Sequence, residues 1–148
     1  GLKMEQNENY IKFINSIFQN LSTALQSIED MLPKVVDEDF KKELSEEYSK
    51  YDLLSRECEM LAKSEGINLK DNNWFEKLKL WGSINMSTMM DKSTRNIAQM
   101  FLLGTVMGIV QCLKDLKDYS SVSDELTDLC TKLSELEENN YQNLKNFL

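Results

Sequence analysis

The sequence predicts an all-α fold, a four-helix bundle that forms one domain over residues 1–148. In four stretches apolar residues recur at alternating spacings of three and four, the pattern of helices that bury one face. The chain has one proline and five glycines, too few for the many turns of a β-sandwich or barrel. A length of 148 residues corresponds to one domain that can bury a substantial core.

The first predicted helix extends from Tyr10 to Leu32. Pro33 ends it, because a residue that precedes proline is disfavoured in the α region. The apolar seam of this helix is formed by Ile11, Ile14, Phe18, Leu21, Leu25, Ile28 and Leu32.

The second predicted helix begins near Asp37 to Asp39, since acidic residues suit a helix N-terminus. Gly66 is placed to cap its C-terminal end in the left-handed conformation. A short connection to the first helix makes the two antiparallel neighbours. The seam consists of Phe40, Leu44, Glu47, Tyr51, Leu54, Cys58 and Leu61.

Residues 66–87 allow two interpretations. The favoured one is a long crossover with a short helix that carries Trp74, Phe75 and Trp81 on one face. The alternative is a single helix that continues to Asp118. That helix would be about 66 Å long at 1.5 Å per residue, much longer than its neighbours.

The third predicted helix runs from about Ser87 to Asp118. Its expected inward residues are Met90, Ser93, Ile97, Met100, Phe101, Gly104, Met107, Val110 and Leu113. The fourth follows a serine cap, Ser121 or Ser123, and continues to the C-terminus. Its seam is Val122, Leu126, Leu129, Leu133, Leu136, Asn140, Leu144 and Phe147.

One long crossover between the middle helices is the ferritin-like arrangement, whose members use Glu and Glu-x-x-His ligands to hold two metal ions. The chain has no histidine. Glu47-x-x-Lys50 and Glu137-x-x-Asn140 stand where the two ligand pairs would be. A lysine repels a cation, and an amide oxygen is a poor replacement for imidazole. We therefore expect no metal and no cofactor.

Glu47, Glu137 and Asn140 form a candidate polar cluster in the core. If the second and third helices are parallel, all three residues lie in the same half of the bundle. A buried Glu and a buried Asn at one level could then hydrogen-bond and specify the register of the helices. An alternative role is to anchor a ligand.

Gly104 and Gly108 are unfavourable inside a helix by about 1 kcal/mol each relative to alanine. We interpret them, with Met100 and Met107, as positions where a neighbouring helix packs closely. The alternative is a small cavity for an apolar ligand.

Charge and composition exclude several classes of function. A net charge of −8 disfavours nucleic-acid binding. No apolar run reaches the length of about 20 residues that spans a bilayer, and no signal peptide is visible. Three cysteines without a C-x-x-C pair indicate buried free thiols in a reducing compartment, so we expect a cytoplasmic protein. No nucleophile and base can be paired, so we expect no enzymatic activity.

The segments STRNIAQMFLLGTVMGI (93–109) and TKLSELEENNYQNLKNFL (131–148) resemble uncharacterised ferritin-like bundle proteins from Gram-positive anaerobic bacteria. The resemblance implies a ferritin-like fold and no established activity. We expect a non-catalytic module that binds a protein or a small apolar ligand. The alternatives are a metal-handling or redox protein descended from a di-iron ancestor, and a structural homodimer.

Overall fold

The computed structural model describes residues 2–70 and 92–148, with side chains from Asn7 onward. These residues form four α-helices and two short 3-10 turns, and no β-strand occurs in the two ranges. The predicted all-α four-helix fold is confirmed. The predicted crossover helix with Trp74, Phe75 and Trp81 lies outside the described residues. The elements are α1 (Leu2–Met31), η1 (Leu32–Lys34), α2 (Glu38–Ser64), α4 (Thr94–Tyr119), α5 (Asp124–Leu144) and η2 (Lys145–Phe147).

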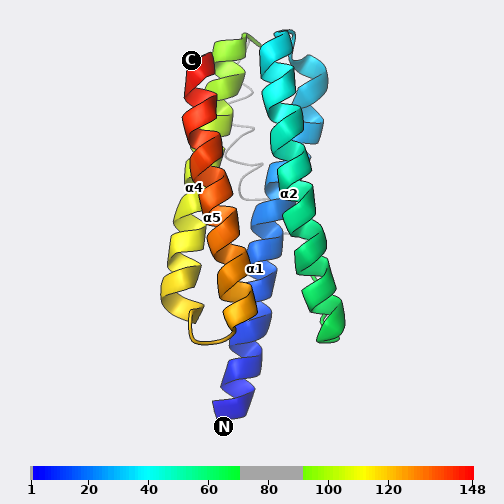
Figure 1. The fold of residues 1–148 in the computed structure, drawn as a ribbon, viewed down its shortest axis with the longest axis vertical. Helices are drawn as coiled ribbons and strands as arrows, with labels where there is room; N and C mark the ends of the chain where they lie inside the picture. Colours follow the sequence, from blue (N-terminus) through cyan, green and yellow to red (C-terminus); the bar gives the residue numbers. More distant parts are fainter. Residues whose placement is uncertain (1, 71–91) are drawn as a thin grey trace.

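The helices form a ring in which α1 packs against α2 and α4, and α5 packs against the same two helices. Figure 1 shows that α1 and α5 run in one direction and α2 and α4 in the other. Every pair of neighbours in the ring is therefore antiparallel, whereas the helices that lie across the ring from each other are parallel. The middle of each helix consequently lies near the middle of the bundle.

The helix ends follow local chemistry that the sequence predicts. Asp37 accepts a hydrogen bond from the Phe40 amide at 2.8 Å and begins α2. The Ser123 hydroxyl accepts a hydrogen bond from the Leu126 amide at 3.2 Å and begins α5. Gly66 has a φ of +67°, and the next amide donates to the Ala62 carbonyl, which is the usual closure of a helix by a left-handed glycine.

The hydrophobic core runs through the centre of the ring, and aromatic rings close its two ends. At one end Phe40 of α2 packs edge-on against Phe101 and lies 4.9 Å from the ring of Phe147. At the other end the rings of Phe13 and Tyr119 are 5.5 Å apart. The predicted seams of α2 and α5 are confirmed. Their buried members are Phe40, Leu44, Glu47, Tyr51, Cys58, Leu126, Leu129, Leu133, Asn140 and Leu144.

The predicted inward face of α4 is wrong over the second half of the helix. Met107, Val110 and Leu113 are 37–54% exposed. Here the buried positions follow the expected ones by one or two residues, a turn of about 100–200° around the helix axis. The buried face bears mainly small or polar side chains, because polar groups from α1 and α5 approach it. The buried residues of α4 are Ile97, Ala98, Leu102, Thr105, Gly108, Cys112 and Asp115.

Two further expectations need correction. The third helix begins at Thr94 rather than near Ser87, because residues 92 and 93 are not helical and the Ser93 hydroxyl caps the Asn96 amide at 3.3 Å. Ile11, which we expected in the seam of α1, is 41% exposed.

Candidate functional site

A polar cluster lies inside the hydrophobic core, about halfway along the bundle. Each of the four helices contributes to it, and every member is at most 3% exposed. The placement follows from the antiparallel ring, which brings the middles of the helices to one level. We call the following six residues the core polar cluster: Asn20 of α1, Glu47 and Tyr51 of α2, Cys112 of α4, and Glu137 and Asn140 of α5.

Glu137 lies on the side of the core polar cluster that faces α1 and α4. The Cys112 thiol donates to Glu137 Oε1 at 3.6 Å. Asn20 Nδ2 lies at hydrogen-bond distance from the Gly108 carbonyl, 3.0 Å, and from Cys112 Sγ, 3.4 Å. These contacts connect α1, α4 and α5 through polar atoms that have no access to solvent.

The surroundings of Glu137 favour its neutral form. Burial raises the pKa of the Glu137 carboxyl from 4.5 to about 8, although hydrogen bonding with Cys112, Asn20 and Tyr51 opposes the rise. The pKa of Tyr51 is raised well above its usual value by burial and by the carboxylates of Glu137 and Glu47. Glu137 is thus mostly protonated at neutral pH.

Glu47 lies one turn before Tyr51 on α2. Burial raises the pKa of its carboxyl to about 10, assisted by a hydrogen bond with Glu43 and opposed by the charge of Lys50. Glu47 Oε2 and Asn140 Nδ2 are both buried, and neither has a hydrogen-bond partner in the described part of the chain. The predicted hydrogen bond between Glu47 and Asn140 is therefore not formed through these two atoms.

Sequence reasoning placed Glu47, Glu137 and Asn140 together in the core, and the structure buries all three, each interacting with Tyr51. It missed Asn20 as a partner. The signal was present, because Asn20 lies three residues after the buried Ile17 and so falls on the inner face of α1. Asn20 was not predicted because only acidic residues of that helix were considered as partners for the buried glutamates.

The cluster does not resemble a metal centre. Within residues 2–70 and 92–148 no three Asp, Glu, Cys or His side chains are arranged to hold a metal ion. Burial raises the pKa of Glu47 and of Glu137, which favours their protonated forms, and protonated carboxyls are poor ligands. The contacts of the core polar cluster connect α1, α4 and α5, and Tyr51 of α2 hydrogen-bonds with Asn140 of α5.

A second polar network joins α1 to α4 nearer the Phe13–Tyr119 end. The Ser16 hydroxyl donates to Asp115 Oδ2 at 2.6 Å, and Gln111 Nε2 donates to Asp115 Oδ1 at 3.0 Å. Burial raises the pKa of Asp115, while the two hydrogen bonds oppose that rise. This network also serves to fix helix positions.

The four residues expected to mark close packing behave differently from one another. At Gly108 an added Cβ would overlap Glu137 Oε2, so close approach is confirmed there. At Gly104 a Cβ would meet no atom of the described residues within 4 Å, and Met107 is 37% exposed, so neither position is closely packed against another described helix. Met100 is half-buried. Gly104 lies at the edge of the buried face of α4, next to the buried Thr105.

The outer side of α4 is apolar and exposed. Its large side chains recur at spacings of three, one, three and three, which places them along one face of the helix. We define this surface as the α4 apolar face. It consists of Leu103 (44% exposed), Val106 (40%), Met107 (37%), Val110 (48%) and Leu113 (54%).

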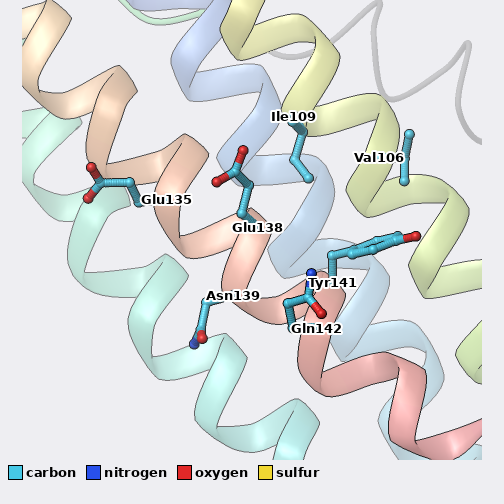
Figure 2. A pocket seen from close by; sticks show the side chains of 7 residues that line it. All are labelled: Val106, Ile109, Glu135, Glu138, Asn139, Tyr141 and Gln142. Atoms are coloured by element: carbon cyan, nitrogen blue, oxygen red, sulfur yellow. The ribbon is translucent and has the colours of Figure 1, made fainter.

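A shallow groove of about 710 Å³ adjoins this surface, between α4 and α5. Figure 2 shows Glu138 facing Ile109 across it, while the ring of Tyr141 extends from α5 toward Val106 on α4. We call it the α4–α5 groove. Its lining residues are Val106, Ile109, Glu135, Glu138, Asn139, Tyr141 and Gln142.

Helix α4 is also long and apolar enough to cross a membrane, the one such helix among the residues that the structure describes. A core helix of a soluble bundle has the same length and composition, so this property is weak evidence for a membrane span. In the bundle α4 buries Asp115 and Thr105 against its neighbours.

The chain matches no known protein-family model, and its comparison with curated proteins and with solved structures finds no similar protein.

Proposed function

We propose that this protein is a non-catalytic interaction module that binds another protein through the α4 apolar face. The observation that carries the proposal is the continuity of this surface, where five large apolar side chains lie next to one another on one helix. Large contiguous apolar patches on soluble proteins mark interaction sites, whereas single exposed apolar residues do not.

The other exposed large apolar residues of the described chain provide the contrast. Ile11, Val36, Leu53, Met60 and Leu148 are separated in the sequence and spread over α1, the α1–α2 connection, α2 and the C-terminus. Among the helices that the structure describes, only α4 presents such residues on consecutive turns.

A binding role is better supported than catalysis or capture of a small apolar ligand. The titratable residues of the core polar cluster are closed to solvent, so a substrate has no path to them. The α4–α5 groove is shallow and open, whereas small apolar ligands are usually enclosed in concave pockets. A shallow apolar groove between two helices is suited to a protein segment.

The proposal includes a ferritin-like arrangement of the helices. In that arrangement one long connection joins two parallel helices. The parallel directions of α2 and α4 in Figure 1 support it. The absence of histidine from the chain speaks against an iron-oxidising role.

Co-purification from source cells tests the proposal with a matched pair of variants. The α4 variant carries Val106→Ser and Val110→Ser. The control carries Leu53→Ser and Met60→Ser on α2, where the side chains are 67% and 72% exposed. Both variants are first shown by thermal unfolding to be as stable as the wild type to within about 1 kcal/mol.

We expect quantitative mass spectrometry to identify a protein that co-purifies with the wild type and the α2 control, and that the α4 variant loses. If the three proteins retain the same set of companions, the α4 apolar face is not an interaction site and the proposal is wrong.

A further inference from the structure

We infer that the partner segment is an amphipathic helix with basic residues along one edge, and that it lies lengthwise in the α4–α5 groove. This inference rests on the proposed function and specifies the chemistry of the partner. Three properties support it: the length of the α4 apolar face, the difference between the two walls of the groove, and the charge of the chain.

The length of the surface matches a short helix. From Leu103 to Leu113 the apolar face extends about 15 Å along α4, at 1.5 Å per residue. A partner helix of about three turns would place side chains of positions i, i+3, i+4 and i+7 against it.

The two walls of the groove differ in chemistry. The α4 wall contributes the apolar side chains of Val106 and Ile109, whereas the α5 wall carries the carboxylates of Glu135 and Glu138. Both glutamates are exposed, and neither forms an ion pair with a described residue. A helix that fills the groove would therefore bury an apolar stripe against α4 and present one polar edge to two negative charges.

A basic edge is the complement of this wall. The cation of α5, Lys132, pairs with Glu57 and Asp128 and with neither groove glutamate. Lys145 of η2 lies with its Nζ 5.4 Å from the ring centroid of Tyr141. The net charge of −8 adds attraction at long range for a cationic segment.

The negative charges of the α5 wall and of the whole chain disfavour three other occupants of the groove: a second copy of the protein, an anionic lipid surface and a nucleic acid. Two copies that meet through this face would bring the acidic walls and two net charges of −8 together. Anionic lipid surfaces and nucleic acids would be repelled by the α5 wall.

Fluorescence anisotropy with synthetic peptides tests the inference. Three helical probes of about 15 residues share one Leu/Ala face and carry Lys, Gln or Glu along one edge of that face. A fourth has the composition of the Lys peptide in an order without amphipathic periodicity. It controls for general attraction of cations to an acidic protein.

We expect the Lys peptide to bind at least about tenfold more tightly than the Gln peptide, and the Glu peptide and the scrambled peptide to bind most weakly. Glu135→Gln with Glu138→Gln should weaken binding of the Lys peptide about fivefold and leave the Gln peptide unchanged. Glu46→Gln with Glu59→Gln, a pair of exposed carboxylates on α2, is the matched control and should have little effect.

The outcomes separate the inference from the proposed function. If the Lys and Gln peptides bind equally and both are weakened by Val106→Ser with Val110→Ser, the face binds helices but the basic-edge inference is wrong. If that α4 variant changes the binding of no peptide, both the inference and the proposed function fail. If light scattering detects a dimer that the α4 variant dissociates, the occupant is a second copy and the inference is overturned.

Discussion

Gly108 of α4 and Glu137 of α5 are in such close contact that no side chain fits between them. A Cβ on Gly108 would overlap Glu137 Oε2, and it would lie 2.8 Å from Glu137 Cδ and 3.0 Å from Asn20 Oδ1. The buried carboxyl thus occupies the space that a side chain would take. This contact sets the distance between α4 and α5 at the level of the core polar cluster.

We predict opposite effects of alanine at the two glycines of α4. Gly108→Ala should lower the free energy of unfolding by about 1–3 kcal/mol, because Glu137 is 2% exposed and has no room to move away. Gly104→Ala should raise it by about 0.5–1 kcal/mol, since alanine favours the helix and no atom lies within 4 Å of the new Cβ. Urea-induced unfolding measures both changes.

A double variant isolates the contact itself. In a Glu137→Ala background the added Cβ of Gly108→Ala no longer overlaps the carboxyl and keeps only the 3.0 Å contact with Asn20 Oδ1, so most of its destabilisation should disappear. If Gly108→Ala lowers the stability equally in the wild type and in the Glu137→Ala background, contact with Glu137 is not the reason for a glycine at position 108.

Most of the fold could be predicted from the sequence, because the seams of α2 and α5 and the helix caps are local signals. Phe40, Leu44, Leu129 and Leu133 lie where the periodicity places them. The orientation of α4 could not be predicted in the same way. From Leu103 to Leu113 the large apolar residues are mostly on the outside, whereas hydrophobicity alone places Val110 and Leu113 in the core.

The members of the core polar cluster can also be identified from local sequence patterns, but their contact partners cannot. Glu47, Glu137 and Asn140 stand out because they are polar residues on apolar seams. Their partners depend on the rotation of each helix, which is determined by packing with the other three. Asn20 and Gly108 therefore meet only in the folded structure.

The stability of the protein should fall as the pH rises, because of Glu47 and Glu137. Their pKa values are 4.5 in the unfolded chain and about 10 and about 8 in the folded protein. Between the unfolded and the folded value, the folded state keeps a proton that the unfolded chain has lost. The free energy of unfolding then decreases by up to about 1.4 kcal/mol per pH unit for each group.

Glu47→Gln should remove the contribution of Glu47 to this dependence. The amide cannot ionise, and its N–H can replace the carboxyl O–H as the donor to Glu43. We expect the variant to exceed the wild type in stability by about 1–3 kcal/mol near neutral pH, with a larger difference at about pH 9. Denaturant unfolding at several pH values measures the slope.

Glu46→Gln is the control for this experiment, because Glu46 is the exposed neighbour of Glu47 on α2. Its stability should stay within about 0.5 kcal/mol of the wild type at each pH. A pH dependence of Glu47→Gln that parallels that of the wild type would contradict the assignment.

The three cysteines should be unreactive in the folded protein. All are free and buried. Burial raises the pKa of Cys58 to about 12. The pKa of Cys112 is also raised, by its hydrogen bond with Cys130 and by burial. Since the thiolate is the reactive form, we expect alkylation at about pH 8 to be at least about a hundredfold slower than in denaturant.

A variant with Ser49→Cys calibrates the alkylation experiment, because Ser49 is exposed on α2. The added thiol should react at the rate of a model peptide while the three native thiols stay unmodified, as mass spectrometry of the intact protein would show. Rapid modification of a native thiol would mean that the core opens locally at that cysteine.

The network around Asp115 should stabilise the contact between α1 and α4. Asp115→Ala removes the acceptor of both Ser16 and Gln111, so we expect a loss of about 1–3 kcal/mol in the free energy of unfolding. Asp118→Ala, at an exposed position one turn later, should change it by less than about 0.5 kcal/mol. Asp115→Asn should lose less than Asp115→Ala, because an amide oxygen still accepts from the Ser16 hydroxyl. Equal losses in the asparagine and alanine variants would show that Asp115 acts through its charge and not through this hydrogen bond.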